Sequence, residues 1–277
     1  MFLKPYNVED LKNVINHYEE NYNETIAQLR KVAQLIFNRE NLEVSIGGTF
    51  SNKTNFESQI FDLIELLPKE VGAKHAETAI FTPKQRAIAF QTSGTVQYNI
   101  QAFDFNKLGI SYHGSMQVLR TITNLEFFWN NIRVQGGAYG CGCNFLRSGI
   151  GYFYSYRDPN LSETYQIYKN LEEYLNDFVA DERQMRKYIL GTINQFDQPK
   201  TSKERFDEAI NQFYRHISYE MIQEQRNQIL DTTIEDIRGF AQLFNQIART
   251  NNICTIGSQN KIQEQNHLFD SVENLIP

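Results

Sequence analysis

Residues 131–159 constrain the fold more than any other stretch of the chain. They place a double glycine, Gly136-Gly137, between the end of an apolar helical pattern and two aromatic-rich runs. Glycine permits positive φ and the close approach of another chain segment, so the pair predicts a turn that ends a helix and begins a strand. Arg133 and Tyr139 flank this turn, six residues apart. A guanidinium and a phenol held beside exposed backbone can grip a peptide carbonyl. The alternative is an ordinary glycine turn with an Arg and a Tyr beside it by chance.

The two runs after the double glycine predict a β-hairpin. In the first, Tyr139–Leu146, Gly140 and Gly142 leave bare backbone on one face, either for helix packing or for a docked ligand. In the second, Ile150–Arg157, three tyrosines occupy alternate positions. We interpret the tyrosines as cross-strand stabilisation in preference to a binding surface.

The rest of the chain mixes strand and helix patterns. Strands are predicted at 42–49, 87–90, 95–105 and 252–257, with a turn at 92–94. Helices are predicted at 51–67, 115–132, 158–179, 181–196, 202–216, 218–230, 233–250 and 258–271. Asp158-Pro159 is expected to begin one helix, and Thr201/Glu204 and Thr232/Glu235 are expected capping boxes.

This order of elements indicates the fold class. Strands paired by turns, with helices packed on one face, indicate an α+β fold with a mostly antiparallel sheet. No low-complexity linker divides residues 40–277, so we predict one α+β domain there. Residues 1–39, with helical spacing over 8–37, form a predicted helical lead segment.

Composition excludes several classes of function. The chain of 277 residues is 41% hydrophobic, enough for a core, and its net charge of −6 with scattered Lys and Arg argues against nucleic acid as a partner. No apolar stretch approaches the ~18–20 residues of a membrane span. The N-terminus resembles neither a signal nor a transit peptide. Three cysteines, one necessarily unpaired, favour a reducing compartment, so we expect a cytoplasmic protein without a membrane partner.

The same residues predict no metal bound by this chain. No two histidines have the spacing of a helical metal pair, and Cys141-Gly-Cys143 is too short for the usual C-x₂₋₄-C clamp. On a strand both thiols face one side and act as small core side chains, as Cys254 does in its apolar run. No G-x-S-x-G elbow, P-loop or G-x-G-x-x-G occurs. A Cys–His pair stays open, although nothing points to one. The five histidines are His17, His75, His113, His216 and His267.

Several motifs together resemble a known family. The run Arg133-Val-Gln-Gly-Gly-Ala-Tyr139-Gly, followed by Ser155-Tyr-Arg-Asp-Pro159, resembles the C-terminal half of the pitrilysin/insulinase zinc metallopeptidases, in their presequence protease branch with its bacterial relatives. Trp129 stands where that branch carries an aromatic. Residues 188–199, 229–238 and 253–257 resemble later segments of the family in the same order, so the resemblance covers residues 40–275.

The resemblance implies a hydrolase built as a clamshell of two halves. The N-terminal half carries an inverted zinc motif, H-x-x-E-H, and this chain is expected to be the non-catalytic C-terminal half of a longer bacterial protein. The zinc is then expected in the N-terminal half of the same polypeptide, which is the expected partner. Short unstructured peptides are the expected substrates.

Four residues are expected to contribute to the active site by this resemblance. Arg133 orients the substrate, and Tyr139 acts as the catalytic donor to the developing oxyanion. Gly136 and Gly137 complete the substrate-binding set, because they let the chain turn so that both side chains face the chamber.

Two alternatives remain. The chain can belong to a catalytically inactive homologue that serves as a structural or assembly subunit, although the presence of both Arg133 and Tyr139 disfavours this. It can also be an unrelated peptide-binding module that uses the hairpin for docking, which the several motifs in order disfavour. An H-x-x-E-H segment upstream of Met1 would separate the peptidase from the scaffold.

Overall fold

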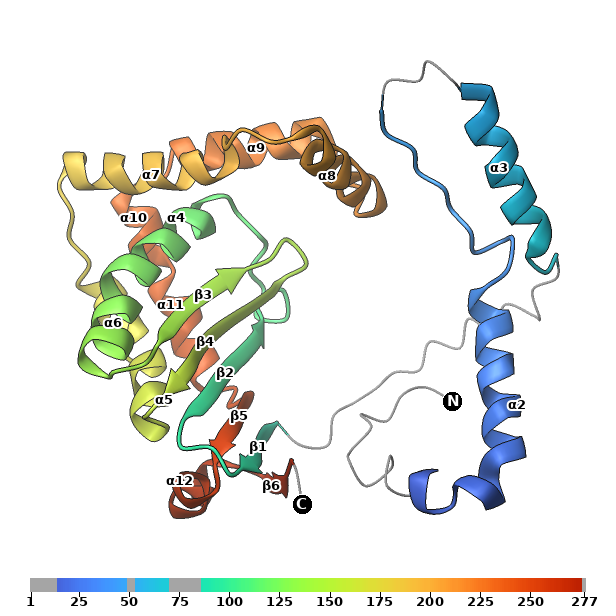
Figure 1. The fold of residues 1–277 in the computed structure, drawn as a ribbon. Helices are drawn as coiled ribbons and strands as arrows, with labels where there is room; N and C mark the ends of the chain where they lie inside the picture. The colour runs from blue at the N-terminus through green and yellow to red at the C-terminus, as the bar shows by residue number, and fades with distance from the viewer. Residues whose placement is uncertain (1–13, 49–52, 70–85, 276–277) are drawn as a thin grey trace. The chain divides into compact units, whose positions relative to one another are not determined.

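The computed structural model describes residues 14–48, 53–69 and 86–275 (Figure 1). Two compact units divide the chain: residues 1–82 with 200–216, and residues 83–199 with 217–277. The chain leaves the second unit after Pro199, adds one helix to the first unit, and returns at Ile217. Neither unit begins or ends at residue 39 or 40. The predicted division into a lead segment, 1–39, and a domain, 40–277, stays a prediction.

The first unit is helical in the part that the structure describes. Its helices are α2 (Tyr18–Ile36), α3 (Lys53–Leu66) and α8 (Ser202–Tyr214). The strand predicted at 42–49 is wrong for residues 42–48, which are irregular. These residues lie against α8 instead: Gly47 sits so close to the Phe206 ring that a Cβ would be 2.2 Å from it, and Tyr214 hydrogen-bonds the side chains of Glu43 and Ser45. Alternating apolar residues make a strand only where a neighbouring strand supplies partners.

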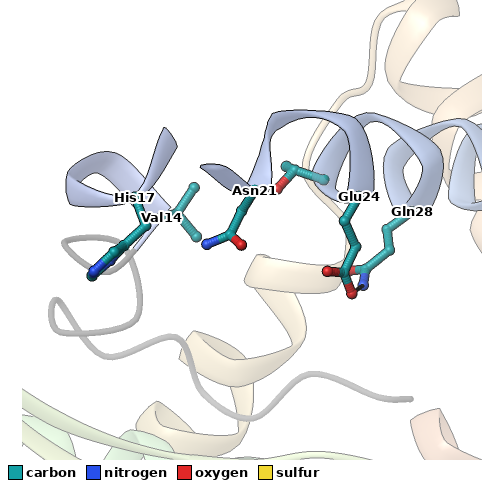
Figure 2. A pocket seen from close by; sticks show the side chains of 6 residues that line it. Val14, His17, Asn21, Glu24 and Gln28 are labelled. Carbon is teal, nitrogen blue, oxygen red and sulfur yellow. Dashed lines mark hydrogen bonds between the residues drawn. The ribbon is translucent and has the colours of Figure 1, made fainter. Parts of the chain in front are cut away.

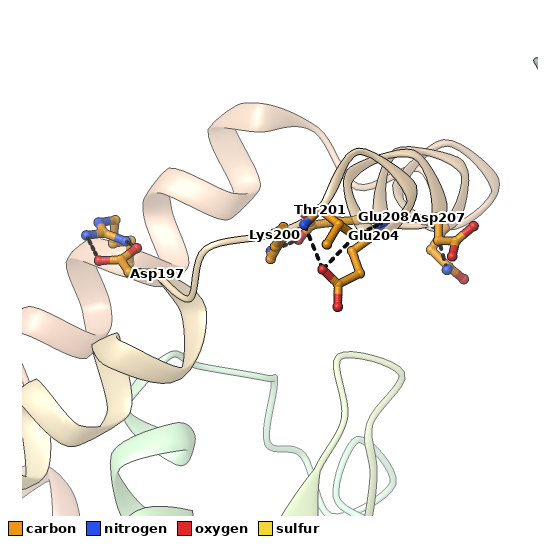
Figure 3. A network of polar contacts seen from close by, with 8 residues as sticks. Asp197, Lys200, Thr201, Glu204, Asp207 and Glu208 are labelled. Atoms are coloured by element: carbon orange, nitrogen blue, oxygen red, sulfur yellow. Dashed lines mark hydrogen bonds and ion pairs between the residues drawn. The ribbon is translucent and has the colours of Figure 1, made fainter. Parts of the chain in front are cut away.

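The start of α8 confirms the predicted capping box at Thr201 (Figure 3). The Glu204 amide donates to Thr201 Oγ1 at 3.3 Å, and the Thr201 amide donates to the Glu204 carboxylate at 2.7 Å. Two ion pairs, the part-buried Lys200–Glu208 and the exposed Lys203–Asp207, lie beside this cap. The cap satisfies amide groups that the first helical turn would otherwise leave unpaired.

The second unit is built on one sheet. Its strands are β1 (Ala87–Thr92), β2 (Gln97–Asp104), β3 (Gly140–Phe145), β4 (Ile150–Asp158), β5 (Ile253–Ser258) and β6 (Ser271–Asn274), in the order β3-β4-β2-β5-β1-β6 (Figure 1). The pairings β2–β4, β2–β5 and β3–β4 are antiparallel, and β1–β5 and β1–β6 are parallel. The predicted α+β class with a mostly antiparallel sheet is confirmed.

The turn at 92–94 joins β1 to β2, but these two strands do not pair, because β5 lies between them. The helix predicted at 258–271 ends early. Helix α12 (Gln259–Glu264) and the short 3-10 helix η2 (Asn266–Leu268) take its first part, and β6 follows as a parallel edge strand. An edge strand this short carries too few alternating positions for a periodicity argument.

The other helices of the second unit lie near the predicted ranges with shifted ends, but the ranges 115–132, 158–179 and 233–250 each hold two helices. They are α4 (Ser115–Ile122), the π-helix η1 (Thr123–Gln135), α5 (Ser162–Lys169), α6 (Leu171–Asn176), α7 (Glu182–Phe196), α9 (Tyr219–Leu230), α10 (Ile234–Gly239) and α11 (Ala241–Ala248). The π-helix changes which side chains face inward. A 3.6-residue period continued from α4 would bring Leu125 towards the core, but it is 59% exposed in the wider turns of the π-helix.

One predicted helix start and one predicted capping box are wrong. Asp158 is fully buried at the end of β4, and α5 begins only at Ser162, because the Asp158 carboxylate accepts hydrogen bonds from Thr164 Oγ1 and the Asn160 amide. The capping box before α10 is Thr233 with Asp236. Thr232 does not cap, since its hydroxyl donates to the Gln228 carbonyl at the end of α9.

The core lies between the sheet and the helices that cover one of its faces (Figure 1). Phe103, Phe145 and Phe153 project from β2, β3 and β4 onto this face. The rings of Phe145 and Phe153 pack against Phe128 of η1, Tyr168 of α5 and Phe244 of α11, at centroid distances of 5.4–6.1 Å. The alternating residues of β2 and β4 therefore point to the opposite face, where Tyr98, Ile100 and Tyr156 are exposed. Among the described helices, none is both long and apolar enough to cross a membrane.

Candidate functional site

The double glycine ends η1 and turns the chain into β3. The Gly137 amide donates to the Arg133 carbonyl at 3.0 Å, and the Ala138 amide donates to the Ile132 carbonyl at 3.1 Å. A Cβ on Gly136 would lie 2.6 Å from the Ile132 carbonyl oxygen, and Gly137 has φ +79°. Both positions therefore require glycine, one for space and the other for its backbone conformation.

The turn brings the Arg133 and Tyr139 side chains close together. The guanidinium carbon of Arg133 lies 4.2 Å from the centroid of the Trp129 ring and 5.7 Å from that of the Tyr139 ring. Tyr139 is 58% exposed, and Arg133 is half-buried. Neither side chain is enclosed in apolar packing, so both are available to a ligand.

Two further residues complete this group, which we call the Arg–Tyr cluster: Trp129, Arg133, Tyr139, Tyr156 and Arg157. The Tyr156 ring lies 5.6 Å from the Tyr139 ring, and the Arg157 guanidinium carbon lies 5.7 Å from the centroid of Tyr139. Sequence reasoning assigned no role to Arg157. The predicted hairpin includes Arg157 in its second strand, but only the strand register, in which the Tyr139 amide donates to the Arg157 carbonyl, brings this residue to the site.

A network of buried and part-buried polar groups hydrogen-bonds to the turn. Asn160 Nδ2 donates to the Gly136 carbonyl at 2.6 Å, and the Asn160 amide donates to Asp158. The Asn160 carbonyl in turn accepts from Asn99 Nδ2 at 3.1 Å, and Asn99 also contacts Ser155 Oγ at 3.1 Å. Hydrogen-bonded polar groups in a core specify one arrangement, because leaving any of them unpaired is costly. The network therefore fixes where the double glycine lies.

The tyrosines of β4 cover the glycines of β3. A Cβ on Gly140 would lie 2.2 Å from the Tyr156 ring, and one on Gly142 would lie 2.8 Å from the Tyr154 hydroxyl. The rings of Tyr152, Tyr154 and Tyr156 follow one another at centroid distances of 6.1 and 6.5 Å. The bare backbone predicted on β3 is thus covered by its own neighbouring strand and not by a helix.

The cysteines are free thiols with little nucleophilic character. Burial is the main cause that raises the pKa of Cys141 to about 11, and burial also raises the pKa of Cys143 and Cys254. Nearby Asp158 raises the pKa of Cys141 further, and Arg133 opposes it. These thiols stay protonated near neutral pH, so they are poor nucleophiles and metal ligands.

The described residues contain no group of three or more His, Cys, Asp or Glu side chains that could hold a metal ion. His113 Nδ1 lies 2.7 Å from Ser115 Oγ, so this nitrogen already has a hydrogen-bond partner. His75 lies outside the described residues. Nothing in this part of the chain fits a zinc ion.

Two surface hollows are lined by none of the residues of the Arg–Tyr cluster. One, of about 500 Å³, is lined by residues between Val14 and Gln28 along α2 (Figure 2). Its wall comes from a single helical stretch. The other, of about 540 Å³, lies on the helical layer of the second unit, between Glu126 and Tyr188. Tyr188 donates to Glu126 there at 3.0 Å.

The fold resembles that of one part of the pitrilysin peptidases. The crystal structure of pitrilysin matches 83% of this chain over 25% of its own length, with a TM-score of 0.50 and 16% sequence identity. A family model described as the PreP C-terminal domain matches residues 89–259. The chain therefore belongs to the PreP C-terminal domain family, and the resemblance predicted from its motifs is confirmed.

Sequence relatives support the same family assignment. Protein HypA of Clostridium perfringens is 35% identical over 95% of this chain, and presequence protease 1 of Arabidopsis thaliana, chloroplastic/mitochondrial, is 25% identical over 94%. The alignments cover 27% and 24% of those proteins. This chain spans about a quarter of the length of these relatives.

Proposed function

We propose that this chain is the substrate-binding C-terminal portion of a zinc metalloendopeptidase that degrades short unstructured peptides. The observation that carries the proposal is the accessible Arg133–Tyr139 pair, joined by a glycine turn, in a chain of the PreP C-terminal domain family. The zinc and its ligands are supplied by polypeptide outside this chain, the N-terminal half of the same protein, where the metal activates the attacking water.

Each residue of the pair has a defined task. Arg133 donates from its guanidinium to a carbonyl or carboxylate oxygen of the peptide, and its stacking on Trp129 limits the orientations of the fork. Tyr139 donates its hydroxyl proton to the oxygen that gains negative charge as the carbonyl is attacked. Gly136 and Gly137 form the turn that brings the two side chains close together.

The proposal places the protein in the bacterial cytoplasm, since all three cysteines are free and a reducing compartment suits them. The expected partners are the N-terminal half and peptide substrates, with no nucleic acid or membrane.

The test uses the longer protein that contains this chain. It should cleave an unstructured fluorogenic peptide, lose that activity with a chelator, and regain it with zinc. The 277-residue chain alone should neither cleave the peptide nor bind zinc stoichiometrically. A longer protein that lacks chelator-sensitive cleavage would support the assembly-subunit alternative instead.

A further inference from the structure

Two guanidinium groups flank one tyrosine ring in the Arg–Tyr cluster. Arg133 and Arg157 each place their guanidinium carbon 5.7 Å from the centroid of Tyr139. The two carbons are therefore separated by at most twice this distance. Arg133 is half-buried and stacked on Trp129, whereas Arg157 is exposed.

Arg157 occupies a β-bulge. Along β2 the residues Gln97 and Tyr98 are consecutive, but their partners on β4 are Asp158 and Tyr156, so Arg157 is the extra residue. Its φ is +47°, in the left-handed region that costs a non-glycine residue about 1–2 kcal/mol. Bulges of this kind redirect a side chain and often lie beside active sites. Both Tyr156 and Arg157 are consequently exposed, while Asp158 is buried.

No carboxylate within the described residues neutralises these two arginines. Neither guanidinium forms an ion pair with a described Asp or Glu, although the chain carries a net charge of −6. The adjacent acid, Asp158, is fully buried and accepts hydrogen bonds from Thr164 and Asn160. The positive charge of Arg157 thus stays open to an anion from outside.

We infer that Arg157 is a specificity-determining residue that binds a carboxylate of the peptide substrate. A peptide in extended conformation rises about 3.3 Å per residue, so the largest possible separation of the two guanidinium carbons corresponds to about three residues. Arg157 therefore takes a carboxylate within about three residues of the group that Arg133 holds. The carboxylate is an acidic side chain or the free C-terminus of the peptide. That the ligand is a peptide rests on the proposed function.

Binding can be measured on the 277-residue chain itself, without hydrolysis. Trp129 is the only tryptophan of the chain and lies in the cluster, so its fluorescence reports occupancy. The probes are short peptides without tryptophan: one with a central Glu and an amidated C-terminus, one with Gln in place of Glu, and the Gln peptide with a free C-terminus. The Glu peptide tests binding of an acidic side chain, and the Gln peptide with a free C-terminus tests binding of the terminal carboxylate.

The variants isolate the charge of Arg157. Arg157→Asn removes it, and asparagine tolerates the left-handed backbone, so the bulge should persist. Arg157→Lys keeps the charge. Arg183→Gln, an exposed arginine in the first turn of α7, is the matched control.

The wild-type chain should bind at least one carboxylate peptide about threefold to fivefold more tightly than the neutral peptide, as expected for an exposed ion pair. The preference should shrink in high salt, vanish in Arg157→Asn, and persist in Arg157→Lys and Arg183→Gln. Equal affinities in the wild type, no binding of any peptide, or a preference that survives Arg157→Asn would each overturn the inference. If the preference depends on Arg157 but the longer protein cleaves nothing, the proposed function fails and the carboxylate site stands.

Discussion

Arg133 stacks on Trp129, four residues earlier on the π-helix, with its guanidinium carbon 4.2 Å from the ring centroid. A planar guanidinium on an indole face keeps its edge donors free, which an ammonium group cannot reproduce. Arg133→Lys in the longer protein should therefore raise KM for a peptide at least tenfold while the protein keeps its thermal unfolding midpoint. Arg183→Lys serves as the control and should leave KM unchanged.

Tyr139→Phe tests the second member of the pair. Only the hydroxyl is lost, and the ring can keep its contacts with Tyr156 and Arg157. Removal of one oxyanion donor costs about 10²–10³ in kcat. We expect that loss in the longer protein with KM nearly unchanged. Wild-type kcat in this variant would remove Tyr139 from the catalytic step.

The glycine turn predicts a graded stability series on the 277-residue chain. Gly137→Ala forces alanine into φ +79° and should lower the free energy of unfolding by about 1 kcal/mol. Gly136→Ala should cost more, because the new Cβ meets backbone that cannot move away easily. Gly191→Ala lies within α7 with open space around it and should instead stabilise by about 0.5–1 kcal/mol. Chemical denaturation of the three variants measures the order, and a harmless Gly136→Ala would contradict this account of the turn.

Asn160 should act as a support for the turn. Asn160→Ala removes the 2.6 Å hydrogen bond to the Gly136 carbonyl but leaves the backbone contact with Asn99 in place. The amides of Gly137 and Ala138 should then exchange with solvent faster, while amides in β5 keep their protection. Hydrogen exchange followed by mass spectrometry or NMR provides the measurement, and unchanged exchange at the turn would show that Asn160 does not hold it.

The pKa of Cys141, raised to about 11, predicts slow alkylation and a pH-dependent stability. At pH 8 the folded chain should react with iodoacetamide far more slowly than the chain in denaturant. Because the folded pKa lies above the unfolded one, the protonated thiol favours folding. That contribution is complete below pH 9 and is lost between pH 9 and 11. Cys141→Ala should lose less stability than the wild type over this interval.

Much of the second unit could be predicted because its patterns are local. The alternation of Tyr152, Phe153 and Tyr154 assigned β4 and its two faces, and Gly136-Gly137 marked the end of η1. Non-local features were out of reach. Placing β5 between β1 and β2 requires contacts such as Ala87 with Ile253 and Tyr98 with Ile256, which are far apart in the sequence and which no periodicity encodes.

Part of the candidate site could likewise be predicted from local sequence, and part could not. Arg133 and Tyr139 are six residues apart on one turn, so their proximity follows from local sequence. Arg157 reaches the same ring only through the register of β4 against β3 and a bulge against β2, neither of which the sequence displays. The predicted role of Asp158 was wrong for a related reason. Asp-Pro predicts a helix start, but Asp158 is buried at the end of β4 and accepts a hydrogen bond from Thr164.

The cover that Tyr156 and Tyr154 provide for Gly140 and Gly142 has a consequence for variation at these four places. The tyrosine side chains of β4 fill the space that side chains at the two glycines of β3 would occupy. A larger residue at 140 should be accepted only together with a smaller one at 156, and the same exchange should hold for 142 and 154. The two substitutions of each pair should therefore rescue one another, whereas each alone is harmful.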